Sequence, residues 1–510
     1  MHSGIVRKPG ISQASVPAPT RTTGREQTQT QRKNRMLTRC LLSTTALALA
    51  VPALAQDIQP VADTVTEVAN DLRGVTFAAD GKIYVSGFRG DDEVETTSIV
   101  GRFNADGTPD TGFGEDGFVE LDLAPGRVEE SMAVVELSGG DVVAAVNAID
   151  EDGGESVYLL RFDSTGAQVT GDAWGGESGA VEVVFGWANA DNGSFPGVEA
   201  PPQDSAWDLD VDASGDVEKL VVNGYGAAGP ETGRTDNDRY VARLLASDGS
   251  NDPDFNGGMP FTYQSAQEFS DGGRRATVEP DGAILSAGYT NLGDTLRNHV
   301  ILIRLNPDGT LDEGFGGFIE PASSGEAVGL TPRPGVAIFN PFVADGGFAE
   351  CYAAVPLSDG SYVTTGYGAA TVEGAPSTLG FQTTEAQDVV TFRVAAGGLD
   401  TSWGNNGLQA IQSEGAGQPT AEDRGRMALA LPGDRTVQVG RYGGVPAAFV
   451  LDASGQLDAG VSDDGIIELP HDSVDSQFFG AALSDDGSRI ALTTNANVAG
   501  ARLVVLDVQS

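Results

Sequence analysis

Short runs in which apolar and polar residues alternate recur along most of the chain. In GVTFAADGKIYVSGF, residues 74–88, Ile83 and Val85 fall on one face and Tyr84 falls on the other. A period of two residues is typical of a β-strand. The Asp80-Gly81 pair between the two runs supplies the positive φ angles that a tight hairpin requires. The pattern therefore predicts an antiparallel hairpin in this segment.

This hairpin is part of a longer unit that recurs. It continues with an apolar strand that contains an arginine, a second turn, and an aromatic-Gly pair about 11 residues past the arginine, most clearly in residues 74–121 and 275–320. Five copies keep the arginine, as Arg102, Arg161, Arg243, Arg304 and Arg393. Their spacings of 59, 82, 61 and 89 residues are uneven, which predicts constant strands joined by loops of variable length.

Four strands are expected from each unit, and such repeats favour a radial array of sheets. We therefore predict an all-β protein, a β-propeller of seven four-stranded blades; six or eight blades, or two smaller arrays, are the alternatives. The domain is expected to span residues 56–510. Its units are predicted at approximately 73–121, 130–200, 204–265, 268–345, 346–422, 423–471 and 474–510.

Two details refine the predicted ring. The seventh unit ends at Leu506–Val508 without its last strand, whereas Asp57–Val68 precedes the first unit. We expect strands from both termini to complete one blade. A glycine also precedes an aromatic residue in four units, at Gly87, Gly224, Gly288 and Gly366, which predicts a bulge or a close backbone approach there.

The repeats resemble a known family. AADGKIYVSG with RFNADGTPDTGFGEDG, and EPDGAILSAG with RLNPDGTLDEGFGG, are similar to the delta-60 repeat, a bacterial unit of exported proteins that is regarded as a β-propeller repeat. The third and fifth copies match moderately, and the other three are degenerate. The resemblance covers roughly residues 73–510 and implies a propeller and export. It implies no catalytic residues, because the function of the family is largely uncharacterised.

Residues 36–55 have the composition of a secretory signal peptide. The apolar run from Leu41 to Val51 is too short to span a bilayer, and Ala53-Leu54-Ala55 forms a cleavage site. We expect a secreted or periplasmic protein that is cleaved after Ala55 and has no membrane span. Residues 1–35 are interpreted as a non-native upstream extension; a long native leader is the alternative.

The charge limits the classes of partner. The chain holds 73 acidic and 30 basic residues, and its net charge of −43 becomes −50 when residues 1–55 are removed. Nucleic-acid binding is excluded, because phosphate recognition requires a basic surface. The acidity suits a salty exterior, where ions screen self-repulsion; an acidic protein of an ordinary periplasm is the alternative.

One segment has the oxygen spacing of a calcium-binding loop. The candidate ligands are Asp210, Asp212, Ser214, Asp216 and Glu218. Val221 stands where such a loop has its bidentate glutamate. Other units have plain Asp-Gly turns at this place, so a solvated hairpin is the alternative. Calcium is the only cofactor that the sequence suggests.

Nucleophilic catalysis has little support in the sequence. Beyond residue 55 there are two histidines, His299 and His471, and one cysteine, Cys351, so three-histidine zinc chemistry is excluded. Neither histidine lies near a nucleophile elbow. His471 is expected at the surface and Cys351 as a buried, inert thiol. Trp207 and the Gly-aromatic pairs are expected in the core between blades.

Two classes of function remain. The first is an exported, monomeric, non-enzymatic propeller that binds a protein or a carbohydrate; the second is a calcium- or carboxylate-dependent hydrolase or lactonase that acts in the axial channel. Several acidic oxygens on the axis would favour the enzyme, and a plugged axis would favour binding. The candidate binding loops are long insertions near Glu177–Gln203, Ser323–Gly347, Ala369–Gln387 and Ser413–Asp423.

Overall fold

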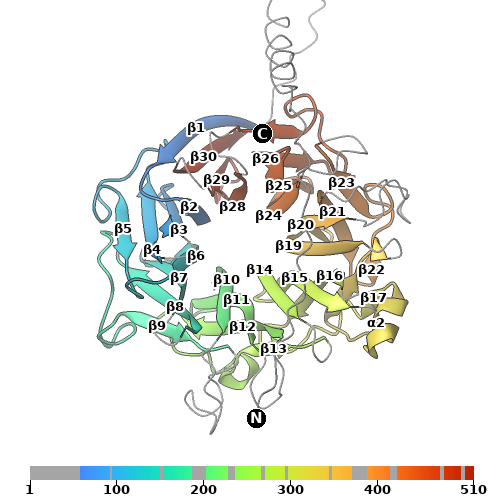
Figure 1. The fold of residues 1–510 in the computed structure, drawn as a ribbon, viewed down its shortest axis with the longest axis horizontal. Helices are drawn as coiled ribbons and strands as arrows, with labels where there is room; N and C mark the ends of the chain where they lie inside the picture. Colours follow the sequence, from blue (N-terminus) through green and yellow to red (C-terminus); the bar gives the residue numbers. More distant parts are fainter. Residues whose placement is uncertain are drawn as a thin grey trace, which may run out of the picture. The chain divides into compact units, whose positions relative to one another are not determined.

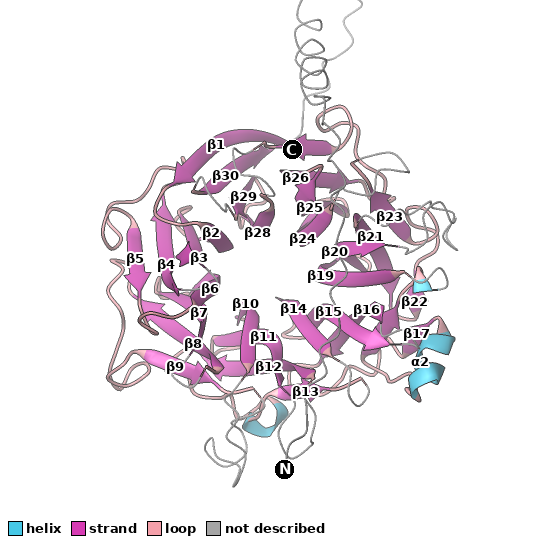
Figure 2. Ribbon diagram, viewed as in Figure 1, coloured by secondary structure: helices cyan, strands magenta, loops and turns pink. Residues whose placement is uncertain are grey.

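The structure is a computed structural model, and it is built almost entirely of β-strands (Figure 2). The described residues are 58–91, 95–149, 153–185, 203–227, 236–265, 270–292, 297–343, 347–369, 387–413, 422–470, 476–495 and 500–509. The predicted extension and signal peptide lie outside them. Within these ranges no helix is both long and apolar enough to cross a membrane.

Seven sheets, in which all strand pairs but one are antiparallel, form the blades of a propeller around a central axis, which confirms the predicted fold (Figure 1). One strand of each blade faces the axis. These innermost strands are β2 (Asp71–Phe77), β6 (Glu129–Glu136), β10 (Asp204–Asp212), β14 (Asp271–Val278), β19 (Phe348–Pro356), β24 (Arg424–Leu431) and β28 (Phe478–Leu483).

The other strands follow outwards in chain order. The second strands are β3 (Ile83–Asp91), β7 (Val142–Ile149), β11 (Lys219–Ala227), β15 (Ile284–Leu292), β20 (Tyr362–Ala369), β25 (Arg435–Tyr442) and β29 (Arg489–Thr494). The third strands are β4 (Glu95–Phe103), β8 (Glu155–Phe162), β12 (Asn237–Leu245), β16 (Arg297–Leu305), β21 (Asp388–Ala395), β26 (Val445–Leu451) and β30 (Ala501–Val508). Shorter outer strands are β5 (Phe118–Leu121), β9 (Ala180–Val183), β13 (Phe261–Tyr263), β17 (Phe318–Glu320), β18 (Val336–Phe339), β22 (Gly398–Leu399), β23 (Leu408–Ile411) and β27 (Ile466–Glu468).

The outermost strand of the seventh blade comes from the other end of the propeller sequence. Strand β1 (Ile58–Thr66) pairs antiparallel with β30, and the strand order of this blade is β1-β30-β29-β28. Figure 1 shows the blue β1 beside the red β30. Arg502 on β30 donates a hydrogen bond of 2.8 Å to Asp63 on β1. The prediction that strands from both termini close the ring is confirmed.

The hydrophobic core is divided among the seven contacts between neighbouring blades. Each cluster of buried apolar side chains is supplied by two adjacent blades, and the last joins blade 7 to blade 1. Alternate residues of each strand face the two neighbours, because strand side chains point to opposite faces. Every blade therefore depends on both neighbours for burial.

The recurring arginine of the third strand joins neighbouring blades. Arg102 forms an ion pair of 2.7 Å with Asp110 and donates a hydrogen bond of 2.6 Å to the Ser164 carbonyl of the next blade. Its guanidinium carbon lies 5.0 Å from the centre of the Phe113 ring. Phe113 is the aromatic residue of the repeat, so the spacing seen in the sequence reflects a cation–π contact.

An acidic side chain at the start of an innermost strand makes a second recurrent link. In four places it accepts the N–H of the second residue beyond the outer strand of the preceding blade. The pairs are Leu123 with Glu129 at 2.6 Å, Phe185 with Asp204 at 2.9 Å, Ser265 with Asp271 at 2.7 Å and Ser413 with Asp423 at 2.7 Å. These bonds fix the chain where it passes from one blade to the next.

The fourth blade differs from the sequence expectation. Part of the predicted loop Ser323–Gly347 forms β18, which pairs with β16, and the expected outer strand β17 pairs parallel to β18 as a fifth strand. The helix α2 (Ala322–Val328) connects them. The reason is hydrophobic: all four residues of β18 are buried, whereas β17 buries only Ile319.

We predict that deleting Asp57–Val68 lowers the melting temperature by about 5–10 °C and causes aggregation. The deletion removes β1 and exposes the backbone edge of β30, which then pairs between molecules. Thermal unfolding and size-exclusion chromatography measure both effects. A deletion of residues 370–386, which lie outside the described residues, is the control. Equal stability of the protein with and without β1 would contradict the role of this strand.

Candidate functional site

Each innermost strand contains a β-bulge at the same position. There the pairing with the second strand shifts by one residue, so that one residue of the innermost strand, or two in blade 4, has no partner across the sheet. We name the first unpaired residues the axial layer; they are Arg73, Met132, Trp207, Arg274, Tyr352, Arg426 and Phe479. Repetition of the bulge brings seven large side chains to one level of the ring.

Glycine on the second strand makes room for the bulge. Five blades have glycine beside it, at Gly87, Gly224, Gly288, Gly366 and Gly440. A Cβ atom at these positions would lie 1.8–2.0 Å from a carbonyl oxygen of the innermost strand, whereas real Cβ atoms stay beyond 3.0 Å. The close backbone approach predicted at the Gly-aromatic pairs is confirmed.

Arginine and aromatic side chains pack together in the axial layer. The Arg274 guanidinium carbon lies 3.9 Å from the ring centre of Trp207 and 4.8 Å from that of Tyr352. Arg426 lies 4.3 Å from the Tyr352 ring. The rings of Trp207 and Phe479, from blades 3 and 7, are 6.4 Å apart, so side chains meet across the axis. The axial layer therefore fills the centre of the ring.

Carboxylates balance most of the positive charge in the axial layer. Arg73 lies 2.8 Å from Glu130, and Arg274 lies 2.7 Å from Glu350. Arg426 donates a hydrogen bond of 2.9 Å to Gln477, and burial lowers the pKa of its guanidinium. Groups engaged in this way hold the layer together and offer few free ligand atoms.

The expectation that Trp207 belongs to the core between blades is wrong. The bulge between Ala206 and Asp208 turns the indole out of the blade interface and against Arg274. Tyr289, the aromatic residue of the Gly-aromatic pair at Gly288, also contacts Arg274, at 5.1 Å. The sequence did contain a signal for this arginine–aromatic packing. It is the Gly288-Tyr289 pair on one strand together with Arg274 on the strand before it.

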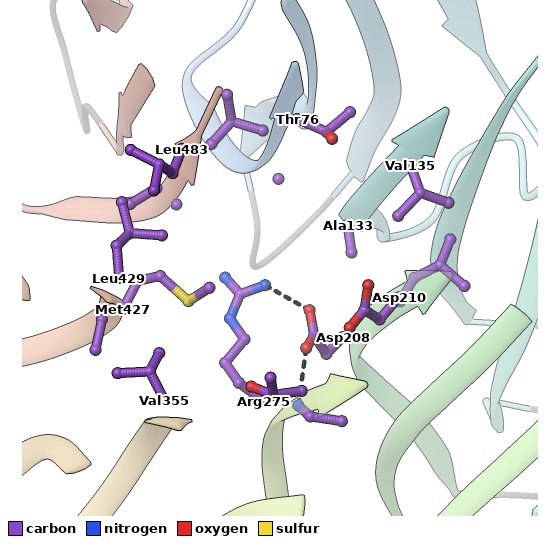
Figure 3. Close-up of a pocket in the computed structure, with 18 of the residues that line it drawn as sticks. Thr76, Ala133, Val135, Asp208, Asp210, Arg275, Val355, Met427, Leu429 and Leu483 are labelled. Carbon is purple, nitrogen blue, oxygen red and sulfur yellow. Dashed lines mark hydrogen bonds and ion pairs between the residues drawn. The ribbon is translucent and has the colours of Figure 1, made fainter. Parts of the chain in front are cut away.

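A buried ion pair lies directly beyond the axial layer (Figure 3). Arg275 and Asp208 follow the bulges of adjacent blades, and Nη1 of the arginine is 2.9 Å from Oδ1 of the aspartate. The second carboxylate oxygen accepts the Ala276 N–H at 2.8 Å. Nη2 of Arg275 reaches the carbonyl oxygens of Arg73 and Phe479 across the ring, each at 3.4 Å. The pair, which joins blades 3 and 4, thus also contacts blades 1 and 7.

A cavity of about 280 Å³ lies beside this ion pair, along the part of the innermost strands that follows the bulges. All seven innermost strands contribute to its lining. Asp210 is among the lining residues, and its carboxylate accepts the N–H groups of Val278 at 2.9 Å and Val211 at 2.8 Å. Burial raises the pKa of Asp210 to about 6.

The structure does not gather the oxygens of the predicted calcium loop. Asp210 faces the axis and bonds to blade 4, Asp212 lies 3.2 Å from Arg243 in its own blade, and Glu218 accepts the N–H of Ser138 in blade 2 at 2.8 Å. Ser214 donates to Asp212, and Asp216 is exposed. No group of three or more His, Cys, Asp or Glu side chains arranged to hold a metal ion occurs in the described parts of the chain. Calcium binding stays a prediction.

A buried serine–histidine pair is present that the sequence did not indicate. Nδ1 of His299 is 2.8 Å from the Arg297 carbonyl oxygen, so it carries the proton, and Nε2 accepts the hydroxyl of Ser324 at 2.9 Å. His299 is 0% and Ser324 4% exposed, so the hydroxyl is closed to substrates. Burial lowers the pKa of His299 to about 4. The pair fastens α2 to β16.

The remaining candidates take no part in a site. Cys351 is buried, as predicted, and burial raises the pKa of its thiol to about 12, so the thiol stays protonated. His471 lies outside the described residues. The same holds for most of three predicted insertions, at residues 186–202, 370–386 and 414–421.

Comparison with protein families matches two segments of the chain, residues 78–113 and 279–315, to a domain of unknown function (DUF5122) beta-propeller. These segments run from the first hairpin turn to the aromatic residue of the repeat in blades 1 and 4. They are the two copies in which the repeat is clearest. No curated protein matches the chain.

We predict that Gly87→Ala lowers the free energy of unfolding by about 3 kcal/mol or more. Its Cβ would lie 1.9 Å from the carbonyl oxygen of Asp71, so the bulge that presents Arg73 must shift. Denaturant unfolding measures the loss. Gly139→Ala is the matched control, because a Cβ there meets nothing within 4 Å. Equal losses in the two variants would contradict the steric argument.

We predict that His299 makes the protein less stable as the pH falls from 7 to 5. The unfolded chain takes up a proton near pH 6.5, whereas the folded chain does so only near pH 4. Over this range the wild type should lose about 2 kcal/mol more unfolding free energy than His299→Gln. Denaturant titrations at both pH values measure the difference. Identical pH slopes would show that the histidine is not held neutral.

Proposed function

We propose that the protein is an exported, non-enzymatic propeller that binds a partner on one face. The observation that carries this proposal is the axial layer. A propeller enzyme of the class considered above needs several free acidic oxygens on the axis. Here the axis holds interlocked arginine and aromatic side chains instead, with Asp208 engaged by Arg275.

The construction of the ring supports a scaffold role. Seven shared cores and the strand pair β1–β30 hold the blades in a closed array. Loops carried by such an array vary without loss of the fold, which is how repeat proteins acquire binding surfaces. The insertions in this chain are polar and acidic.

Charge and export define the kind of partner. The predicted signal peptide directs the chain out of the cytoplasm, where a protein or a carbohydrate is the expected ligand. The net charge of −50 beyond residue 55 favours a partner with a basic surface, because opposite fields speed the encounter. One face of the ring carries the turns that join each innermost strand to its second strand. Val217 lies in such a turn, between β10 and β11, with Asp216 and Glu218 as neighbours, and is 50% exposed.

The second class, a calcium- or carboxylate-dependent hydrolase, has less support. Two carboxylates line the axial cavity, Asp208 and Asp210. Asp208 is neutralised by its ion pair with Arg275, so only Asp210 is left to serve as a catalytic or metal-binding group. The other members of the calcium loop bond to separate blades.

We predict that a photo-cross-linking amino acid at Val217 captures one partner of discrete mass in the exported fraction of cells that make the protein. The same probe at Asp122, in the connection between β5 and β6 at the opposite face, should capture none. Mass spectrometry identifies the adduct, and the recovered chain should begin at Gln56. Adducts at both positions or at neither would contradict a one-face scaffold, and a chain that begins near Met1 would contradict export.

A further inference from the structure

The axial cavity has a closed floor and a defined size. The Arg275–Asp208 ion pair and the axial layer lie at one end, and the cavity measures about 280 Å³. Pockets for small ligands usually range from about 300 to 1,000 Å³, so this one admits only a compact molecule. The cavity lies at the central axis of the ring, and residues from every blade line it.

One negative charge in the cavity has no ionic partner. Asp208 and Arg275 cancel each other at 2.9 Å. Asp210 receives hydrogen bonds from two backbone N–H groups, of Val278 and Val211, and no Lys, Arg or His side chain pairs with it in the part of the chain that the structure describes. A carboxylate in these surroundings favours a bound cation, because neither the backbone dipoles nor the walls neutralise it.

The opposite wall of the cavity is apolar. Figure 3 shows Met427, Leu429 and Leu483 across from Asp210. A divalent metal ion requires several oxygen ligands, which this wall does not provide. An anion would need a free cation, but both arginines of the lining are engaged: Arg275 with Asp208 and two carbonyl groups, and Arg73 with Asp71 and Glu130.

We propose that the axial cavity binds a compact organic cation, whose protonated amine contacts Asp210 and whose apolar body packs on Met427, Leu429 and Leu483. Charge and shape both select this class. The ammonium supplies hydrogen-bond donors to a carboxylate that has none from a side chain, and the hydrocarbon covers an apolar wall that otherwise faces water. This site goes beyond the proposed scaffold role, which uses the surface of the ring.

Three probes test the proposal: cyclohexylammonium, cyclohexanol and cyclohexanecarboxylate. They share a cyclohexane ring and differ in the charge of its substituent. Calorimetry and ligand-observed NMR of the purified protein at 0.15 M salt, a value near physiological ionic strength, should show one site for cyclohexylammonium. Its affinity should exceed that for each other probe at least tenfold. Asp210→Asn should lower the affinity for cyclohexylammonium at least tenfold and leave that for cyclohexanol unchanged.

Two further variants make the result decisive. Asp172→Asn removes an equal charge from an exposed turn and should bind like the wild type; an equal loss there would reveal unspecific attraction to an acidic protein and overturn the site. Thr76→Phe fills the cavity while it keeps Asp210, and it should abolish binding. A folded Thr76→Phe protein that still binds cyclohexylammonium would overturn the proposal, even if Asp210→Asn failed to fold. Cross-linking at Val217 is independent of all these results, so the scaffold role stands or falls separately.

Discussion

The centre of the propeller depends on how closely two backbones approach each other. In five blades a carbonyl oxygen of the innermost strand occupies the space where a side chain of the second strand would begin. Only glycine permits this, and the extra residue that results leaves the plane of the sheet. In these five blades the axial-layer residues, the ion pair beyond them and the adjoining cavity lining follow from this steric condition. Blades 2 and 7 contain the same bulge without this glycine. Val146 and Thr494 stand at the corresponding positions of their second strands.

The scarce basic residues are concentrated inside an otherwise acidic molecule. Only 22 Lys and Arg lie beyond residue 55, against 72 Asp and Glu. Ten of the arginines have internal roles: Arg73, Arg274, Arg275 and Arg426 at the axis, Arg239 in the contact between blades 3 and 4, and the five repeat arginines. Arginine suits these positions because its planar group stacks on rings and donates several bonds at once. The surface is therefore left even more acidic than the composition suggests.

Local patterns predicted most of the fold, whereas the centre of the ring was beyond them. Alternation, Asp-Gly turns and the arginine–aromatic spacing act within one blade, so a single sequence reveals them. The axial layer takes one residue from each of seven distant strands, and the bulge reverses the face on which each would lie by simple alternation. Trp207 was misplaced for this reason, and Asp210 was read as part of a hairpin loop instead of the axial lining. The outer strand β18 was missed because its apolar run follows a helix that the repeat does not contain.

The pairing of β1 with β30 sets the order in which the molecule forms. Asp63 and Arg502 are separated by 439 residues, so the ring stays open until nearly the whole propeller sequence has emerged. Contacts between such distant segments carry a large loop-closure entropy and form late. Blades 1 to 6 each contain strands that are neighbours in sequence, so their formation requires no contact between the distant ends of the propeller. Completion of the seventh blade is then the single step that converts a curved stack of sheets into a ring without free ends.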